Sequence, residues 1–440
     1  MSETILVRHG IVITMDAEDR IYEDGAVAIQ DGRMVAVGKT DEVEREYKGD
    51  IVIEARKKAV LPGLVNLHYH TDSVTRGILD DKPLEEYLEK LWYPAIKSIT
   101  PEETYASAML SYCESIKSGT TCINDMYRNM ISCAEAAEKV GIRAFLSCDV
   151  GDEDSGLDTL KDNERLIREK EGAADGRIRT LVGIEWIPIT SKETVAAARE
   201  LADKYGVGVH VHINENLWGI EKTKERYGRT ELELAYDCRV LGPDCIAAHC
   251  VWLTDPEIAL IRETGTHVAH CPSSNAKLGN GIARIPDLLR YGVNVGLGHD
   301  AAACNNRADM FEVMKWAALI HRAYRVDASL LPAKQVLRMA TVNGAKALGM
   351  EREIGSLEVG KKADLITVDL NALHLTPVVL GKYFNVLSHL VYATHGEDVC
   401  DVIIDGRVVM ENRVIKTVDE AEVIERASKA SESLLGGILP

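Results

Sequence analysis

Residues 61–72 read LPGLVNLHYHTD, and this stretch decides the fold. An apolar run after Pro-Gly ends in His68 and His70, with Asp72 close behind. Successive side chains of a β-strand alternate between its two faces, so residues two apart point the same way. The stretch therefore predicts a buried strand that carries two imidazoles on one face at its carboxyl end.

Length and composition exclude several classes of protein. The chain has 440 residues, which suits one large domain with a smaller one. Its formal net charge of −18 would repel phosphate, so nucleic acid and anionic membranes are not expected partners. The ten cysteines contain no CxxC pair, and the start, MSETILVRHGIVITMD, has no signal-peptide pattern. We therefore expect reduced thiols and a cytoplasmic protein.

The middle of the chain, residues 59–351, alternates short apolar runs with amphipathic helical stretches. One repeat is IRTLVGIEW followed by KETVAAARELADKYG. Repeats of this kind imply an α/β protein with a parallel sheet, and the length suits a (β/α)8 barrel. An open doubly wound sheet is the alternative, and the ends of the strands decide between the two.

The two ends of the chain share a different pattern. GAVAIQDGRMVAVG in the first 58 residues and DVCDVIIDGRVVMENRVI within 352–425 each place DGR between β-rich runs, which indicates a hairpin. We expect residues 1–58 and 352–425 to form one composite β domain, with the barrel inserted between them. Residues 426–440 are expected to form a C-terminal helix or tail.

Polar residues recur where the later strands are expected to end. The segments concerned are VGVHVHINE, AAHCVWL and VGLGHD, which carry His210, His212, Glu215, His249, His299 and Asp300. In a barrel the carboxyl ends of all strands meet at one mouth, where active sites lie.

Imidazole and carboxylate together are typical ligands of a metal such as zinc, and a catalytic metal keeps one position for water. This pattern predicts His68, His70, His212 and Asp300 as the ligands. Glu215 and His249 are expected beside the ion, and His210, one layer deeper, is expected either as a hydrogen-bonded core group or in a supporting role.

With these motifs, the chain resembles the amidohydrolase superfamily. The branch is that of the S-adenosylhomocysteine/methylthioadenosine deaminases and the triazine hydrolases, relatives of atrazine chlorohydrolase and melamine deaminase. PGLVNLHYHTD resembles the first metal motif and HINE the HxxE of the deaminating branch. AAHCVWL, HCPSSNAKLGNGIARIP and GLGHDAAACNN resemble three later signatures, so the likeness covers essentially the whole chain.

The resemblance implies a distorted (β/α)8 TIM barrel with a composite β-sandwich and one divalent metal ion. Zn2+ is the expected ion and Fe2+ the alternative, on the same four ligands. Two-metal relatives carry a lysine on the fourth strand, and RTLVGIEWIPIT contains none. Homo-oligomers are common among such proteins, so an oligomer is expected.

The resemblance also assigns roles in a hydrolytic deamination. Asp300 would take a proton from the attacking water. Glu215 would protonate a ring nitrogen of the substrate and then pass a proton to the leaving group. His249 would hydrogen-bond the attacking oxygen. The expected activity is release of ammonia from a small amino-substituted N-heterocycle.

Three departures from the methylthioadenosine branch bear on the substrate. Ile96 stands where an acid would grip the ribose, two expected arginines are not evident near Cys148, and Glu185 or Trp186 replaces a base-contacting histidine. These departures favour a ribose-free nucleobase-, pterin- or s-triazine-like substrate. The residues expected to contact it are Trp92, Glu185, Trp186, His299 and Cys304.

Three alternatives remain at this stage. The first is an S-adenosylhomocysteine/methylthioadenosine deaminase. The second is a triazine chlorohydrolase or N-dealkylating hydrolase of the same family. The third is a metal-binding protein without catalysis, against which the intact set around Glu215 argues.

Overall fold

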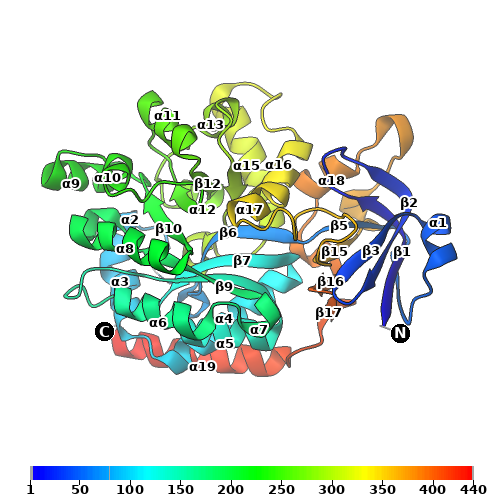
Figure 1. Ribbon diagram of the computed structural model, residues 1–440, viewed down its shortest axis with the longest axis horizontal. Helices are drawn as coiled ribbons and strands as arrows, with labels where there is room; N and C mark the ends of the chain where they lie inside the picture. Colours follow the sequence, from blue (N-terminus) through cyan, green and yellow to red (C-terminus); the bar gives the residue numbers. More distant parts are fainter. Residues whose placement is uncertain (1–2, 79, 439–440) are drawn as a thin grey trace.

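The structure is a computed structural model that describes residues 3–78 and 80–438 (Figure 1). One of its two large sheets contains nine strands that all run parallel. These are β6 (Leu64–His70), β7 (Thr120–Tyr127), β8 (Arg143–Cys148), β9 (Ile178–Ile184), β10 (Gly208–Ile213), β11 (Cys245–His249), β12 (His267–His270), β13 (Val295–Leu297) and β14 (Asp300–Ala301).

Strands β13 and β14 together form the eighth strand of a closed barrel. Strand β13 pairs with β12, and β14 pairs with β6, which closes the sheet on itself. Between them lies Gly298, where a Cβ atom would stand 2.8 Å from the Cβ of His68. The eighth strand therefore passes too close to the metal motif for any side chain at residue 298. The predicted (β/α)8 barrel is confirmed in its distorted form.

Helices cover the outside of the barrel (Figure 1). The longer ones are α4 (Pro101–Lys117), α5 (Met130–Val140), α6 (Leu160–Lys170), α8 (Lys192–Tyr205), α9 (Leu217–Tyr227), α10 (Glu231–Asp237), α11 (Asp255–Thr264) and α15 (Met310–Arg325). Capping boxes begin α4 and α11, in which Thr100 pairs with Glu103 and Thr254 with Glu257. In the described part of the chain, no helix combines the length and apolar character needed to cross a lipid bilayer.

The second sheet joins both ends of the chain, as the paired DGR turns predict. Its strands are β1 (Thr4–Ile13), β2 (Ile21–Gln30), β3 (Arg33–Lys39), β4 (Ile51–Glu54), β5 (Lys58–Pro62), β15 (Leu365–Asp369), β16 (Val399–Ile404), β17 (Arg407–Glu411) and β18 (Val414–Ile415). Antiparallel pairing of β5 with β15 connects the two halves.

Both expected hairpins are present, and their turns touch. Gln30 pairs with Arg33, and Ile404 with Arg407, each across a two-residue turn. A Cβ atom at Gly406 would lie 2.4 Å from the Cα of Gly32, so the two turns can meet only because both residues are glycine.

A buried ion pair holds the barrel against the second sheet. Arg143, at the start of β8, donates to both carboxyl oxygens of Asp364 at 2.8 and 2.9 Å. A paired geometry of this kind fixes orientation, and removal of one partner would leave an uncompensated buried charge.

The C-terminal helix α19 (Glu420–Ile438) packs along α4, starting before the expected residue 426. The domain limits at 58/59 and 351/352 stay predictions, and the first falls at the start of β5.

Candidate metal and active site

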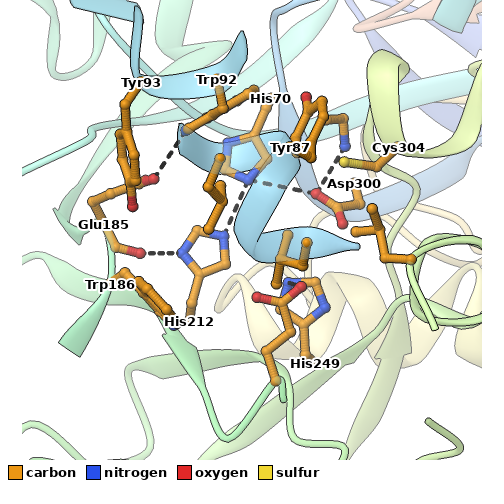
Figure 2. Close-up of a pocket in the computed structure, with 15 residues that line it drawn as sticks. His70, Tyr87, Trp92, Tyr93, Glu185, Trp186, His212, His249, Asp300 and Cys304 are labelled. Atoms are coloured by element: carbon orange, nitrogen blue, oxygen red, sulfur yellow. Dashed lines mark hydrogen bonds and ion pairs between the residues drawn. The ribbon is translucent and has the colours of Figure 1, made fainter. Parts of the chain in front are cut away.

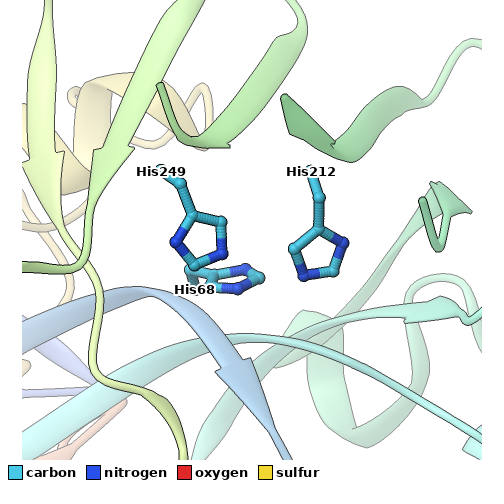
Figure 3. A group of neighbouring side chains, drawn as sticks. All are labelled: His68, His212 and His249. Carbon is cyan, nitrogen blue, oxygen red and sulfur yellow. The ribbon is translucent and has the colours of Figure 1, made fainter. Parts of the chain in front are cut away.

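Side chains from three barrel strands meet at one end of the barrel. His68 and His70 come from β6, His212 from β10 and Asp300 from β14. The Nε2 atom of His70 lies 3.1 Å from Nε2 of His212 and 3.5 Å from Oδ1 of Asp300. The Nε2 atom of His68 lies 3.4 Å from the same oxygen. The four predicted ligands therefore converge (Figures 2 and 3).

The second nitrogen of each imidazole is already engaged. His70 Nδ1 donates to the carbonyl oxygen of Met126 at 2.6 Å, and His212 Nδ1 donates to that of Glu185. His68 Nδ1 lies 2.8 Å from Nε2 of His210, so His210 contacts a predicted ligand. Such partners orient a metal-binding histidine and leave its Nε2 lone pair free.

The donor set fits one divalent metal ion. His68 Nε2 is buried and has no hydrogen-bond partner among the described residues, although a buried polar atom normally has one. Burial lowers the pKa values of His68, His70 and His212, which keeps the rings neutral. For Asp300, burial raises the pKa, but the hydrogen bond from His68 and the neighbouring imidazoles outweigh burial and lower the pKa. Neutral imidazoles beside a carboxylate are the ligand forms that zinc-type ions require.

Glu215 and His249 stand beside this cluster, as predicted. His249 Nε2 lies 3.9 Å from Oε1 of Glu215, and its ring stacks at 5.4 Å on the ring of His212. Glu215 Oε1 accepts a hydrogen bond from Asn280 Nδ2 at 2.8 Å. Burial raises the pKa of Glu215, so the carboxyl holds its proton to a higher pH than an exposed glutamate.

Backbone strain marks two of these positions. His249 has φ 68° and Asp300 has φ 70°, in the left-handed region that non-glycine residues rarely occupy. His249 is the last residue of β11, and Asp300 is the first residue of β14. Strain held at such residues is typical of functional sites, because surrounding contacts must maintain it.

A cavity opens beside the cluster and contains most of the predicted substrate contacts. Trp92, Glu185, Trp186 and Cys304 all line it (Figure 2). His299 does not. Its ring nitrogens face the carbonyl oxygens of Asp300 and Arg307, and its backbone N–H donates to Asn66 Oδ1 at 2.9 Å. We therefore remove His299 from the proposed substrate contacts and assign it to the support of Asp300.

Sequence reasoning missed two groups of residues at the site. One is the wall formed by residues 84–93, from which Leu84, Tyr87, Leu88 and Tyr93 line the cavity. The other lies in the stretch HCPSSNAKLGN, where Ser274 contacts Asp300, Asn275 contacts His249 and Asn280 contacts Glu215. The polar run in that stretch was a usable signal, because three neutral polar side chains, two of them donors and one an acceptor, follow an expected strand end.

Glu231 supports the loop that carries Glu215, and its titration can be tested. Its Oε2 accepts from the backbone N–H of Asn214 at 2.7 Å, and burial raises its pKa from 4.5 to about 8. The folded state therefore binds this proton more tightly, so the stability it confers is complete below about pH 4.5 and lost as the pH rises through about 8. We expect the melting temperature to fall less between about pH 6 and pH 9 in Glu231→Gln, which keeps an acceptor, than in the wild type. Equal falls in calorimetry would contradict the expectation.

Comparison with known proteins gives matches along nearly the whole chain. The amidohydrolase family matches residues 59–409, and an imidazolonepropionase-like composite domain of bacteria matches residues 25–47. A 5'-deoxyadenosine deaminase of Methanosarcina mazei is 42% identical over 438 residues, which cover 99% of each chain. A 5-methylthioadenosine/S-adenosylhomocysteine deaminase of Acetivibrio thermocellus is 38% identical and covers 95% of this chain and 96% of its own.

A solved structure agrees in fold. An adenosine deaminase from Xanthomonas campestris, with bound zinc, superimposes with a TM-score of 0.91 at 31% identity and covers 98% of both chains. The zinc in that structure agrees with the divalent metal that the cluster around His68 fits.

Proposed function

Because this chain belongs to the amidohydrolase family, we propose that it is a zinc-dependent aminohydrolase that releases ammonia from an amino-substituted purine or a related N-heterocycle. One observation carries the proposal. The free Nε2 atoms of His68, His70 and His212 and the carboxylate of Asp300 converge, with Glu215 and His249 beside them. A purely structural metal site would not require a buried carboxyl group such as that of Glu215 beside the ligands.

The chain's own residues provide the proton transfers. A bound divalent ion would supply a Lewis acid and lower the pKa of a water molecule. Asp300 is placed to accept the proton of that water. Glu215, which burial keeps protonated to a higher pH, donates to the ring nitrogen next to the reacting carbon. His249, whose other nitrogen faces Asn275 Oδ1 at 2.9 Å, hydrogen-bonds the incoming oxygen. One water enters, and one ammonia leaves with the amino nitrogen.

Two lines of argument bear on the substrate. The names of the relatives favour an adenine nucleoside with a modified 5' position, the alternative to the ribose-free heterocycle favoured by Ile96 and Glu185. Among the described residues that line the cavity there is no lysine or arginine. That absence disfavours substrates with a phosphate or carboxylate near the ring, because nothing would neutralise their charge.

The test is an ammonia-release assay on zinc-loaded protein. The panel contains 5'-deoxyadenosine, 5'-methylthioadenosine, adenine, guanine, a pterin and melamine, with a chlorotriazine to detect chloride instead. We expect ammonia from at least one purine or nucleoside and no chloride. Chloride without ammonia, or no turnover of any amino-heterocycle, would overturn the proposed function.

A further inference from the structure

Glu185 presents one unpartnered carboxyl oxygen at the cavity. The residue follows β9 directly, is 4% exposed and lines the cavity beside Trp92 and Trp186. Its Oε1 accepts a hydrogen bond from the indole Nε1 of Trp92 at 3.2 Å. Its Oε2 is buried and has no partner in the described part of the chain. The Trp92 indole therefore holds Oε1 in place, and Oε2 is left free to accept a hydrogen bond from a ligand.

The position of this carboxyl places it beside the reacting ring of a substrate. The indole of Trp92 stands edge-on to the ring of His70, with centroids 5.1 Å apart. The main-chain oxygen of Glu185 accepts from His212 Nδ1. Glu185 thus contacts one proposed metal ligand, His212, through its main chain, and the partner of its carboxyl group, Trp92, packs against another, His70. Since the attacked carbon must lie beside the ion, the carboxyl faces the heterocycle itself and not a distant substituent.

The acidic groups around Glu185 favour a hydrogen-bond donor on the ligand, while the Tyr93 hydroxyl and Trp186 indole N–H of the same cavity, unpartnered within the described residues, call for acceptors on its other edges. The cavity also contains the carboxyl groups of Glu215 and Asp300, and no cationic side chain is among its described lining residues. Asp149, whose neighbour Val150 accepts from the backbone N–H of Glu185, is buried with both carboxyl oxygens unpartnered. A buried acceptor without a partner is unfavourable, so a ligand that brings an N–H group to it gains on binding.

We propose that Glu185 selects heterocycles whose six-membered ring carries a second N–H group, either an N–H of that ring or an amino group on it other than the one that leaves. The inference rests on the proposed function and narrows its substrate class to 2-amino-substituted purines and similar diamino- or amino-oxo-heterocycles. The six-membered ring of adenine offers only acceptor nitrogens and the leaving amino group, and the one ring N–H of the free base lies on the five-membered ring. Adenine would leave the Glu185 oxygen without a partner.

The decisive variant is Glu185→Gln. Because Trp92 Nε1 donates, it holds the amide oxygen, and the amide NH2 then occupies the place of Oε2. The variant therefore converts an acceptor into a donor at nearly constant shape. The double variant Glu185→Gln/Trp92→Phe removes the holding indole and lets the amide rotate. This double variant is the matched control, because it tests whether the indole of Trp92 sets the orientation of the new amide group.

The assay compares 2,6-diaminopurine with adenine, both as free bases and as 5'-deoxynucleosides. For the wild type we expect kcat/KM to favour the 2-amino compound by about tenfold or more, because a buried hydrogen bond to a carboxyl group changes binding by this order. In Glu185→Gln the ratio should fall below one, and in the double variant it should return towards one. Calorimetric Kd values for 2-aminopurine and purine should show the same order without any turnover.

The outcomes separate the two proposals. Ammonia release with a wild-type ratio near one, or with a ratio unchanged in a folded Glu185→Gln protein, overturns the role of Glu185 and leaves the proposed function standing. No ammonia from these compounds or from any amino-heterocycle of the first panel overturns the proposed function. The Kd values then still decide on Glu185, since equal affinity for 2-aminopurine and purine would overturn the inference.

Discussion

Glu215→Gln is expected to lower kcat by about 10²–10⁴-fold while the bound metal stays at the wild-type level, because general acid–base catalysis contributes an effect of that size. The glutamine keeps the shape of the side chain and can still pair with Asn280, which contacts Glu215 Oε1 at 2.8 Å. It cannot release or accept the proton that the ring nitrogen and the leaving amino group require. KM should change far less than kcat, because the lost interaction belongs to the transition state.

The control for this variant is Glu225→Gln, which removes an exposed acid from the same helix region, α9. It should retain full activity. Metal analysis and steady-state kinetics on the same preparations decide the matter. Near-normal turnover by Glu215→Gln would exclude Glu215 as the proton carrier, and loss of metal would show that it acts instead on the ion.

The architecture was predictable from the sequence because it depends on local patterns. The offset of two between His68 and His70, and again between His210 and His212, identified strands with one polar face. The paired DGR turns identified a sheet shared by both ends of the chain. Each of these signals spans only a few residues. The regular periodicity of the strand backbone is enough to convert each signal into a predicted arrangement in space.

The supporting contacts were not predictable, because they depend on residues far apart in sequence. Asn280 reaches Glu215 across 65 positions, and Trp92 reaches Glu185 across 93. No spacing rule connects such pairs before the barrel has closed. His299 shows the same limit. It adjoins a predicted ligand, yet its ring is directed towards the carbonyl of Arg307 and away from the cavity.

The second large effect is expected from His212→Ala. The variant removes one of the four converging donors and leaves the Nε2 atom of His70 without the neighbour now 3.1 Å away. We expect bound zinc to fall to a small fraction of the wild-type level and ammonia release to fall by at least ~10³-fold, because the activated water depends on the ion. Added zinc should raise the melting temperature of the metal-depleted wild type and not that of the variant, since only a protein that binds the ion gains stability from it.

His267→Gln is the matched control, because His267 is a buried histidine of β12 that contacts the carbonyl oxygen of Pro243 at 3.1 Å and lies outside the cluster. It should keep both the zinc and the thermal response, which separates the loss of a ligand from the loss of a buried imidazole. If His212→Ala binds zinc as tightly as the wild type, then the ion does not lie where His68, His70 and Asp300 converge. The assignment of the metal site, and with it the mechanism built on Glu215, would have to be abandoned.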